Sequence, residues 1–197
     1  MQVRRYAAIA VLAVTATAVL TLNRHEAAEP GSTEPRPVAA AVASQPRGTD
    51  VLFAQMMVLH HEQAVRMSRA LVAKPGVPER LRLIADFIAH DQQREIDEMN
   101  GWLTAWGLPG AEAGAHTDHG MLTEEQLRQL DTAAFPAAGP LFLEQMTEHH
   151  RGAVLMARSL LDTGGANAYL HGVAKHVINE QTAEIDAMQR LIREGTP

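Results

Sequence analysis

The sequence predicts an all-α protein built as a four-helix bundle, and three observations support this prediction. Apolar residues make up 46% of the chain and aromatic residues only 4%, so the core must be built from Leu, Ala, Val, Ile and Met. Such a composition favours packed helices over a β-sandwich. Four long segments also carry apolar residues at helical spacing. Two of these segments repeat the other two at a constant distance along the chain.

The repeated stretch is centred on two adjacent histidines. Residues 57–67 read M-V-L-H-H-E-Q-A-V-R-M, and residues 146–156 read M-T-E-H-H-R-G-A-V-L-M. The same offset of 149 − 60 = 89 residues also relates Phe53 to Phe142, Gln92 to Gln181 and Glu95 to Glu184. A gapless offset held across separate segments indicates an internal duplication. Each half is therefore expected to be one αα-hairpin, and the two hairpins are expected to be related by a pseudo-two-fold axis.

Residues 1–23 have the pattern of an export signal. Two arginines precede an apolar run over residues 6–22 that no polar face interrupts. The run is a little short for a membrane-spanning helix, so an uncleaved N-terminal anchor is the alternative. Residues 24–48 are rich in Ala, Pro, Glu and Ser, which predicts a disordered linker before a bundle domain at residues 49–195. The protein is therefore expected to be secreted or extracytoplasmic, with membrane contact only through such an anchor.

The first hairpin is bounded by residues that favour helix ends. Asp50 is a suitable N-cap for the first long helix, and Lys74-Pro75-Gly76 stops that helix. Pro78 is expected at the first position of the second helix, because proline has no N–H and a fixed φ angle. The second helix should end at the Gly107-Leu108-Pro109-Gly110 segment.

The second hairpin follows a polar connection over residues 107–122. Thr123-Glu124-Glu125-Gln126 has the pattern of a capping box and predicts a short helix to about residue 132. Gly139-Pro140 opens the third long helix, which should end before Gly164-Gly165. The fourth long helix is expected from about residue 167 to residue 193.

Polar side chains lie within the apolar stripes of all four long helices. At an angular step of about 100° per residue, His60 and Met57 fall inside the first stripe and His61 lies at its edge. Glu95 lies on the shoulder of the second stripe, whose centre passes through Gln92. The second copy repeats these positions. The candidate metal ligands are Met57, His60, His61, Glu95, Met146, His149, His150 and Glu184.

These side chains point towards the bundle interior, where unpaired polar groups are costly, so they must contact one another or a ligand. Imidazole binds copper, zinc, iron and nickel, and a thioether adds a preference for Cu(I). Copper is therefore the predicted metal, with zinc or iron as alternatives. A buried hydrogen-bond network that sets the helix register is the structural alternative.

The connection between the hairpins holds a second, weaker candidate site. His116, His119 and Met121 could capture a soft or borderline cation there, although a solvated polar loop explains them equally well. His90, His171 and His176 lie off the main stripes and are expected at the surface. The absence of cysteine excludes disulfides, thiolate ligands and thiol catalysis. The net charge of −6 argues against nucleic-acid binding and favours cations as partners.

The motif M-x-x-H-H-x-x-A-x-x-M, followed in each half by Q-x-x-E-I-x-x-M, resembles the bacterial domain of unknown function 305 (DUF305) family from about residue 50 to residue 192. The resemblance implies a ferritin-like four-helix bundle, usually exported, with copper bound through His and Met in some members. The motif carries this role over to Met57, His60, His61, Met146, His149 and His150. The Glu-x-x-His pairs of di-iron ferritin-like proteins are absent. The second copy also has Gly139 where the first has Asp50.

Three classes of function follow from these patterns. The leading hypothesis is an exported metal-binding protein that serves in metal handling or tolerance. A structural or partner-binding bundle with a buried polar layer, or a metal-dependent enzyme, are the alternatives. No catalytic triad order or nucleotide-binding loop is present in the sequence, and no catalytic residue is predicted. An enzyme would need an open coordination position and a substrate cleft, which a sequence does not reveal.

Overall fold

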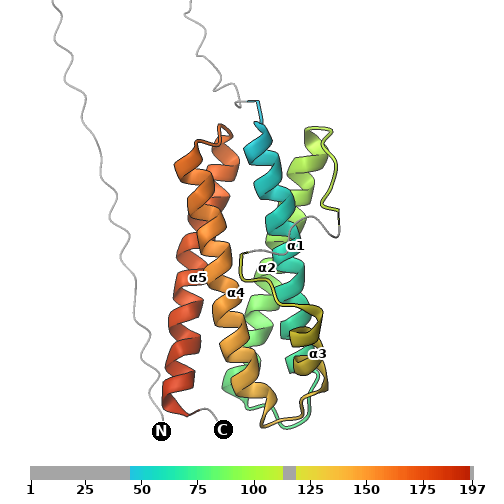
Figure 1. Cartoon of the computed structure of the whole chain (residues 1–197), viewed down its shortest axis with the longest axis vertical. Helices are drawn as coiled ribbons and strands as arrows, with labels where there is room; N and C mark the ends of the chain where they lie inside the picture. The colour runs from blue at the N-terminus through green and yellow to red at the C-terminus, as the bar shows by residue number, and fades with distance from the viewer. Residues whose placement is uncertain (1–44, 113–118, 196–197) are drawn as a thin grey trace, which may run out of the picture. The chain divides into compact units, whose positions relative to one another are not determined.

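The computed structural model describes residues 45–112 and 119–195, and all regular structure in these ranges is helical. The helices are α1 (Gly48–Val72), α2 (Glu79–Ala105), α3 (Glu124–Thr132), α4 (Ala138–Thr163) and α5 (Ala168–Glu194). The four long helices form a bundle, and α3 packs near one end of it (Figure 1). The predicted all-α four-helix bundle is therefore confirmed. The predicted export signal and residues 24–44 of the predicted linker lie outside the described residues.

The connections between the long helices explain their directions. Short loops join α1 to α2 and α4 to α5, so the two helices of each hairpin are antiparallel neighbours (Figure 1). The longer connection through α3 returns the chain to the end of the bundle where α2 begins, so α4 runs antiparallel to α1 where the two pack together (Figure 1). Within the described ranges, no helix combines the length and apolar character that a membrane crossing requires.

The helix starts differ from the predicted ones at two positions. Arg47 is the N-cap of α1, while Asp50 lies in its first turn and accepts a hydrogen bond from the Arg47 N–H at 2.8 Å. Asp50 is buried, and its carboxylate also accepts a hydrogen bond from the N–H of Ala166 at 3.1 Å, in the loop between α4 and α5. Pro78 is the N-cap of α2 and not its first helical residue. The capping box at Thr123 is confirmed: its Oγ1 accepts from the Gln126 N–H at 3.3 Å.

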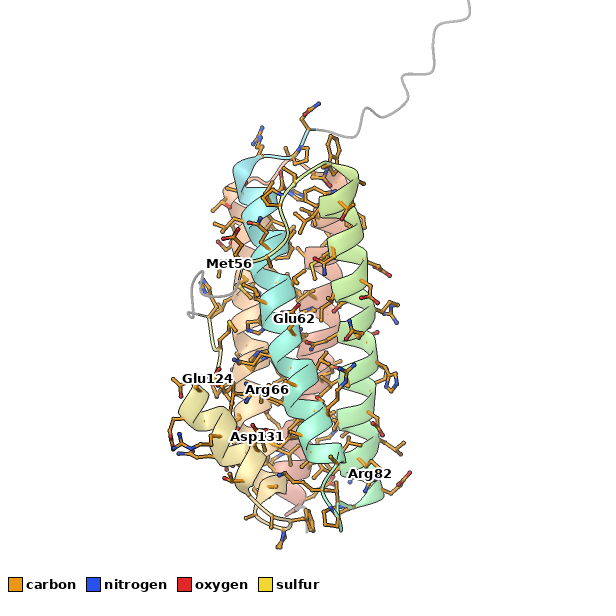
Figure 2. The ribbon with its side chains drawn as sticks, turned by 90° about the vertical axis from the view of Figure 1, so that its right-hand side faces the viewer. Met56, Glu62, Arg66, Arg82, Glu124 and Asp131 are labelled. Carbon is orange, nitrogen blue, oxygen red and sulfur yellow. The ribbon has the colours of Figure 1, made fainter. Side chains whose placement is uncertain are left out.

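Side-chain contacts fix α3 against α1. Figure 2 shows Arg66 of α1 facing Glu124 and Asp131 of α3. The Arg66 Nη2 atom donates to Asp131 Oδ2 at 3.0 Å, and its Nη1 atom lies 3.5 Å from Glu124 Oε2. Leu127 and Leu130 are the buried residues of α3. This short helix is therefore held against the side of the bundle, near one end, by two buried leucines and by the ion pairs of Arg66.

The core consists of two apolar clusters, one on each side of a polar layer. The first contains Phe53, Met57, Met99, Met156, Leu160 and Leu170, among others. The second contains Met67, Leu71, Leu81, Phe142, Met146 and Met188, among others. Residues separated by 89 positions fall into opposite clusters, as Met57 and Met146 do. The pseudo-two-fold axis that relates the hairpins therefore passes through the polar layer between the clusters.

Candidate metal centre

Four histidines form the middle of the polar layer, and all four are fully or almost fully buried. His60 and His61 come from α1, and His149 and His150 come from α4. The imidazole rings of His60 and His149 have their centroids 3.7 Å apart with an interplanar angle of 35°. These two residues are related by the 89-residue offset, so the pseudo-two-fold axis brings equivalent histidines into direct contact.

Each outer histidine bonds to a carboxylate from the second helix of its own hairpin. His61 Nε2 lies 2.8 Å from Glu95 Oε2, and His150 Nε2 lies 2.7 Å from Glu184 Oε2. Counting residues from the loop centre at Gly76 predicts His61 level with Gln92, one turn away from Glu95. The Glu95 side chain is long enough to span that turn, and this explains the observed pair.

The hydrogen bonds determine which imidazole nitrogen is available to a ligand. These contacts favour the tautomer in which the Nε2–H group of His61 and of His150 donates a hydrogen bond to a carboxylate. The lone pair is then on Nδ1. His60 Nε2 lies 3.1 Å from the backbone oxygen of His119, so its Nδ1 is available in the same way. Nδ1 of all four histidines is buried and lacks a hydrogen-bond partner among the described residues. A histidine whose second nitrogen donates to a carboxylate or carbonyl is the usual arrangement of a metal ligand.

The electrostatic environment keeps the inner histidines neutral. Burial, reinforced by the nearby His61, lowers the pKa of His60 from its ordinary value of 6.5 to about 3. Burial and the adjacent His60 also lower the pKa of His149 well below its usual value. Burial is the largest single effect on the pKa of Glu95 and acts to raise it, but the hydrogen bond from His61 and the neighbouring positive charges together outweigh burial, so the pKa is lowered. The two inner imidazoles are therefore uncharged bases at neutral pH, which is the form that binds metals.

The connection between the hairpins covers the histidine layer through its backbone. The carbonyl of His119 reaches His60, and Gln63 forms two bonds with Leu122: Nε2 to the carbonyl oxygen at 3.0 Å and Oε1 from the N–H at 2.6 Å. A Cβ atom on Gly152 would lie 1.5 Å from the His119 oxygen, so only glycine allows this approach. Of the predicted loop site, His116 lies outside the described residues, and His119 is exposed and contributes its carbonyl.

The structure separates the two methionines of the predicted site. Met57 and Met146 are both fully buried, but they belong to opposite core clusters, one on each side of the histidines. Each methionine precedes the inner histidine of its own helix by three residues, so each half carries one Met and His pair on one helical face. Gln92 and Gln181 are also buried, and their amide groups have no hydrogen-bond partner among the described residues.

The histidine layer does not gather three nitrogen or oxygen donors from His, Asp or Glu at metal-binding spacing. Within the described ranges, such a group is formed only by Asp91, Glu95 and His176, whose ligand atoms lie within 4.8 Å of one another. Sequence reasoning missed Asp91 and placed His176 among surface residues. The repeat gives no signal for His176, because its counterpart at the 89-residue offset is Phe87.

The fold and the buried layer define a class of helical bundle in which two hairpins, each with an adjacent histidine pair, meet at a shared polar centre. A family model described as "Domain of unknown function (DUF305)" matches residues 50–192. The chain therefore belongs to the DUF305 family, as the motif resemblance indicated. A search of curated proteins found no match.

Several solved structures share this fold. A DUF305 fragment from Deinococcus radiodurans is 26% identical, with a TM-score of 0.68 over 76% of this chain and 98% of that one. A putative secreted DUF305 protein from Streptomyces coelicolor is 31% identical, with a TM-score of 0.68 over 74% of this chain and 93% of that one. CopM in its Cu(I)-bound form is 31% identical, with a TM-score of 0.63 over 77% of this chain and all of that one.

Proposed function

We propose that this protein is an exported copper-binding protein that holds copper at the buried histidine layer and serves in metal handling or tolerance. The observation that carries the proposal is the set of four buried imidazoles whose Nδ1 atoms have no hydrogen-bond partner among the described residues. Nε2 of His60, His61 and His150 contacts an oxygen atom, and this hydrogen bond fixes the tautomer of each ring.

The residues present suit copper in chemistry as well as in protonation. The inner imidazoles are neutral, and a thioether lies one helical turn before each of them at Met57 and Met146. Imidazole and thioether together favour copper, and the thioether favours Cu(I) in particular. In this proposal the four imidazoles and the two methionines supply the donor atoms for copper. Glu95 and Glu184 orient His61 and His150 through hydrogen bonds. The two carboxylates therefore act as supporting groups and not as the direct metal ligands that the sequence suggested.

The structural alternative is weakened by the same contacts. A polar layer whose only role is to set helix register would be expected to satisfy its own hydrogen bonds. Here the amides of Gln92 and Gln181 and both ring nitrogens of His149 have no partner among the described residues. Unpaired buried polar groups each cost about 1 to 3 kcal/mol, so a ligand that bonds to them would stabilise the fold.

The comparisons support copper as the metal. Structures of CopM were determined in Cu(I)-bound, Cu(II)-bound and Ag-bound forms, and these chains are 29–32% identical to this one. Export is supported by the pattern of residues 1–23 and by the description of the Streptomyces coelicolor relative as a putative secreted protein.

The proposal is tested by titrating the metal-free protein with Cu(I) and with Zn²⁺ under anaerobic conditions. We expect tight Cu(I) binding that the variant Met57→Leu with Met146→Leu weakens by at least about tenfold, because lost ligands cost at least as much as lost supporting contacts. Zn²⁺ binding should change much less. Met56→Leu is the matched control, since Met56 is only partly buried and adjoins Met57. Equal Cu(I) affinities in the control and the double variant would contradict the role of the methionines, and absent Cu(I) binding would contradict the proposal.

A further inference from the structure

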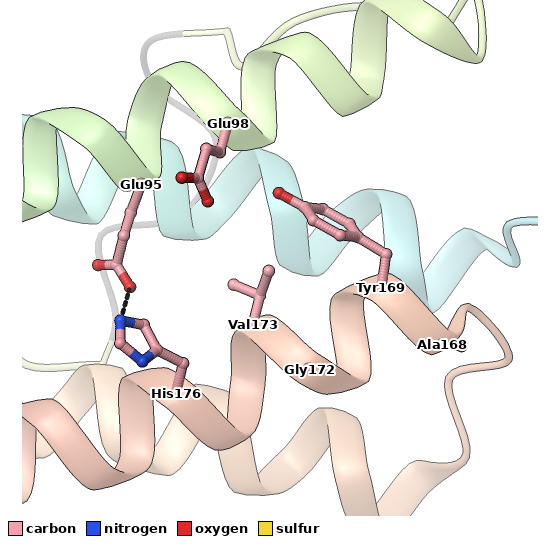
Figure 3. Close-up of a pocket in the computed structure, with 7 residues that line it drawn as sticks. All are labelled: Glu95, Glu98, Ala168, Tyr169, Gly172, Val173 and His176. Atoms are coloured by element: carbon pink, nitrogen blue, oxygen red, sulfur yellow. Dashed lines mark ion pairs between the residues drawn. The ribbon is translucent and has the colours of Figure 1, made fainter. Parts of the chain in front are cut away.

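A pocket between α2 and α5 adjoins the histidine layer from the outside. It has a volume of about 360 Å³ and is lined by Glu95 and Glu98 from α2 and by Tyr169, Val173 and His176 from α5 (Figure 3). Glu95 belongs to both places, because its Oε2 atom bonds to His61 while its other oxygen faces His176. The pocket therefore gives access to a carboxylate that also bonds to the buried His61.

Three side chains in and beside this pocket are arranged as metal ligands. The donor atoms of Asp91, Glu95 and His176 all lie within 4.8 Å of one another. His176 Nε2 is 3.5 Å from Glu95 Oε1, as the dashed line in Figure 3 marks. Glu95 is only 6% exposed, and its Oε1 atom has no hydrogen-bond partner among the described residues. A buried carboxylate oxygen with no hydrogen bond, directed at an imidazole, indicates that a third group belongs between them.

The other half of the bundle provides an internal comparison. A second pocket of about 290 Å³ is lined by Leu83, Ile84, Phe87, Glu180, Ala183, Glu184 and Ala187. The 89-residue offset relates the two pockets: Glu95 corresponds to Glu184, His176 to Phe87 and Glu98 to Ala187. The carboxylate that bonds to the buried histidine is thus present in both pockets. The imidazole donor is present in one of them.

We propose that Asp91, Glu95 and His176 form a second metal site, which binds a divalent cation such as Zn²⁺ or Cu²⁺ on the outer side of the histidine layer. One imidazole and two carboxylates without a thioether suit a divalent cation better than Cu(I). This site goes beyond the proposed function, because its donors differ in kind from the buried histidines and methionines.

The charge of the pocket agrees with a cation as its ligand. Glu95 and Glu98 both line it, next to His176. Burial, together with Glu98 and Glu95, raises the pKa of Tyr169, whose ring extends towards Glu98 in Figure 3. The carboxylates therefore create a negative potential that a divalent cation would reduce.

Arg94 competes with a cation for these carboxylates. It pairs with Asp91 Oδ1, and its Nε atom lies 3.8 Å from Glu98 Oε1. The Arg94 side chain is 56% exposed, so it can move into solvent when a cation binds. An exposed ion pair of this kind contributes little, and its displacement should lower the affinity for the cation by at most about fivefold.

The test is a calorimetric titration of the metal-free full chain with Zn²⁺, carried out in the variant His60→Ala with His149→Ala. This background removes the two contacting imidazoles at the centre of the proposed copper layer, and changes at His176 and His90 are then compared within it to isolate the outer site. We expect one equivalent of Zn²⁺ to bind, and His176→Gln to weaken that binding by at least about 100-fold through loss of its only imidazole donor. His90→Gln is the matched control, because His90 is also exposed but lies outside the cluster. No Zn²⁺ binding in this background, or equal Zn²⁺ binding by the His176 and His90 variants, would overturn the site.

A second measurement uses the wild-type protein, in case the inner histidine changes disturb folding. The imidazole nitrogen resonances of His176 should shift as the first equivalents of Zn²⁺ are added, while those of His90 stay in place. If the His176 resonances do not respond to Zn²⁺, the site does not exist. Failure of Cu(I) binding in the earlier titration would leave both of these results unchanged, so the two proposals are tested separately.

Discussion

Gln63 and Gly152 occupy equivalent positions in the two hairpins, since 152 − 63 = 89, and both hold the same loop against the histidine layer. Gln63 forms two hydrogen bonds with the backbone of Leu122. Gly152 has no side chain, and this leaves room for the His119 carbonyl, which contacts His60. This difference between equivalent positions allows a single connection to contact a symmetric centre.

We predict that Gly152→Ala destabilises the protein and exposes His60. The added Cβ would overlap the His119 oxygen, and overpacking of this kind typically costs about 1 to 3 kcal/mol in the free energy of unfolding. Chemical denaturation measures this change. Gly101→Ala in α2 is the control, because no atom lies within 4 Å of its added Cβ, and it should stabilise the helix by about 0.5 to 1 kcal/mol. Similar stabilities for the two variants would contradict the close approach of the loop.

We predict that the metal-free protein loses stability as the pH falls below about 6.5. The pKa of His60 is about 3 in the folded state against an ordinary 6.5, and the pKa of His149 is also lowered. Below pH 6.5 these histidines are protonated in the unfolded chain but stay neutral in the folded chain. Their contribution to the free energy of unfolding is therefore complete above pH 6.5 and is lost as the pH falls below that value. Each histidine should contribute a slope of about 1.4 kcal/mol per pH unit.

Denaturant unfolding at pH values from 7 to 5 measures this slope in the presence of a chelator. The lowered pKa of Glu95 acts in the same direction, but only below its ordinary value of 4.5, so this window isolates the histidines. His90→Gln removes an exposed histidine and should leave the slope unchanged. A free energy of unfolding that stays constant between pH 7 and pH 5 would show that the inner imidazoles are protonated at little cost.

We predict that Glu184→Gln weakens Cu(I) binding by about 10- to 100-fold while the protein remains folded. An amide in place of the carboxylate accepts a weaker hydrogen bond from His150 Nε2 and can also donate to it, so the tautomer with Nδ1 free is held less firmly, and the loss of such supporting groups has effects of this size. Glu148→Gln in α4 is a suitable control, because that carboxylate pairs with Arg151 at the surface. If both variants bind Cu(I) as tightly as the wild type, His150 takes no part in metal binding.

The sequence predicts those features that depend on local pattern and on the repeat. Helical spacing places the four long helices, the capping box at Thr123 marks the start of α3, and the 89-residue offset brings His60 to His149. Contacts between segments remote in sequence are not predictable in this way. Asp50 is a residue type that favours N-cap positions, but its side chain instead bonds to the loop at Ala166, which lies 116 residues away.

The site was predicted only in part for the same reason. His176 is half-exposed and lies off the apolar stripe of α5, so only the packing of α5 beside Glu95 reveals it. The separation of Met57 from Met146 follows from the antiparallel course of α1 and α4, which places equivalent residues on opposite sides of the axis (Figure 1). Helical periodicity within one helix does not contain this information.

The most direct test of the shared histidine centre is a double-mutant cycle on Cu(I) affinity. His60→Ala, His149→Ala and the variant with both changes would be compared with the wild type in an anaerobic titration against a competing chelator. Because the two rings are in contact, we predict that each change weakens binding and that the combined effect departs from the sum by at least about 0.5 kcal/mol. Additive effects would mean that the two histidines bind copper separately, and wild-type affinity in the double variant would contradict the copper centre itself.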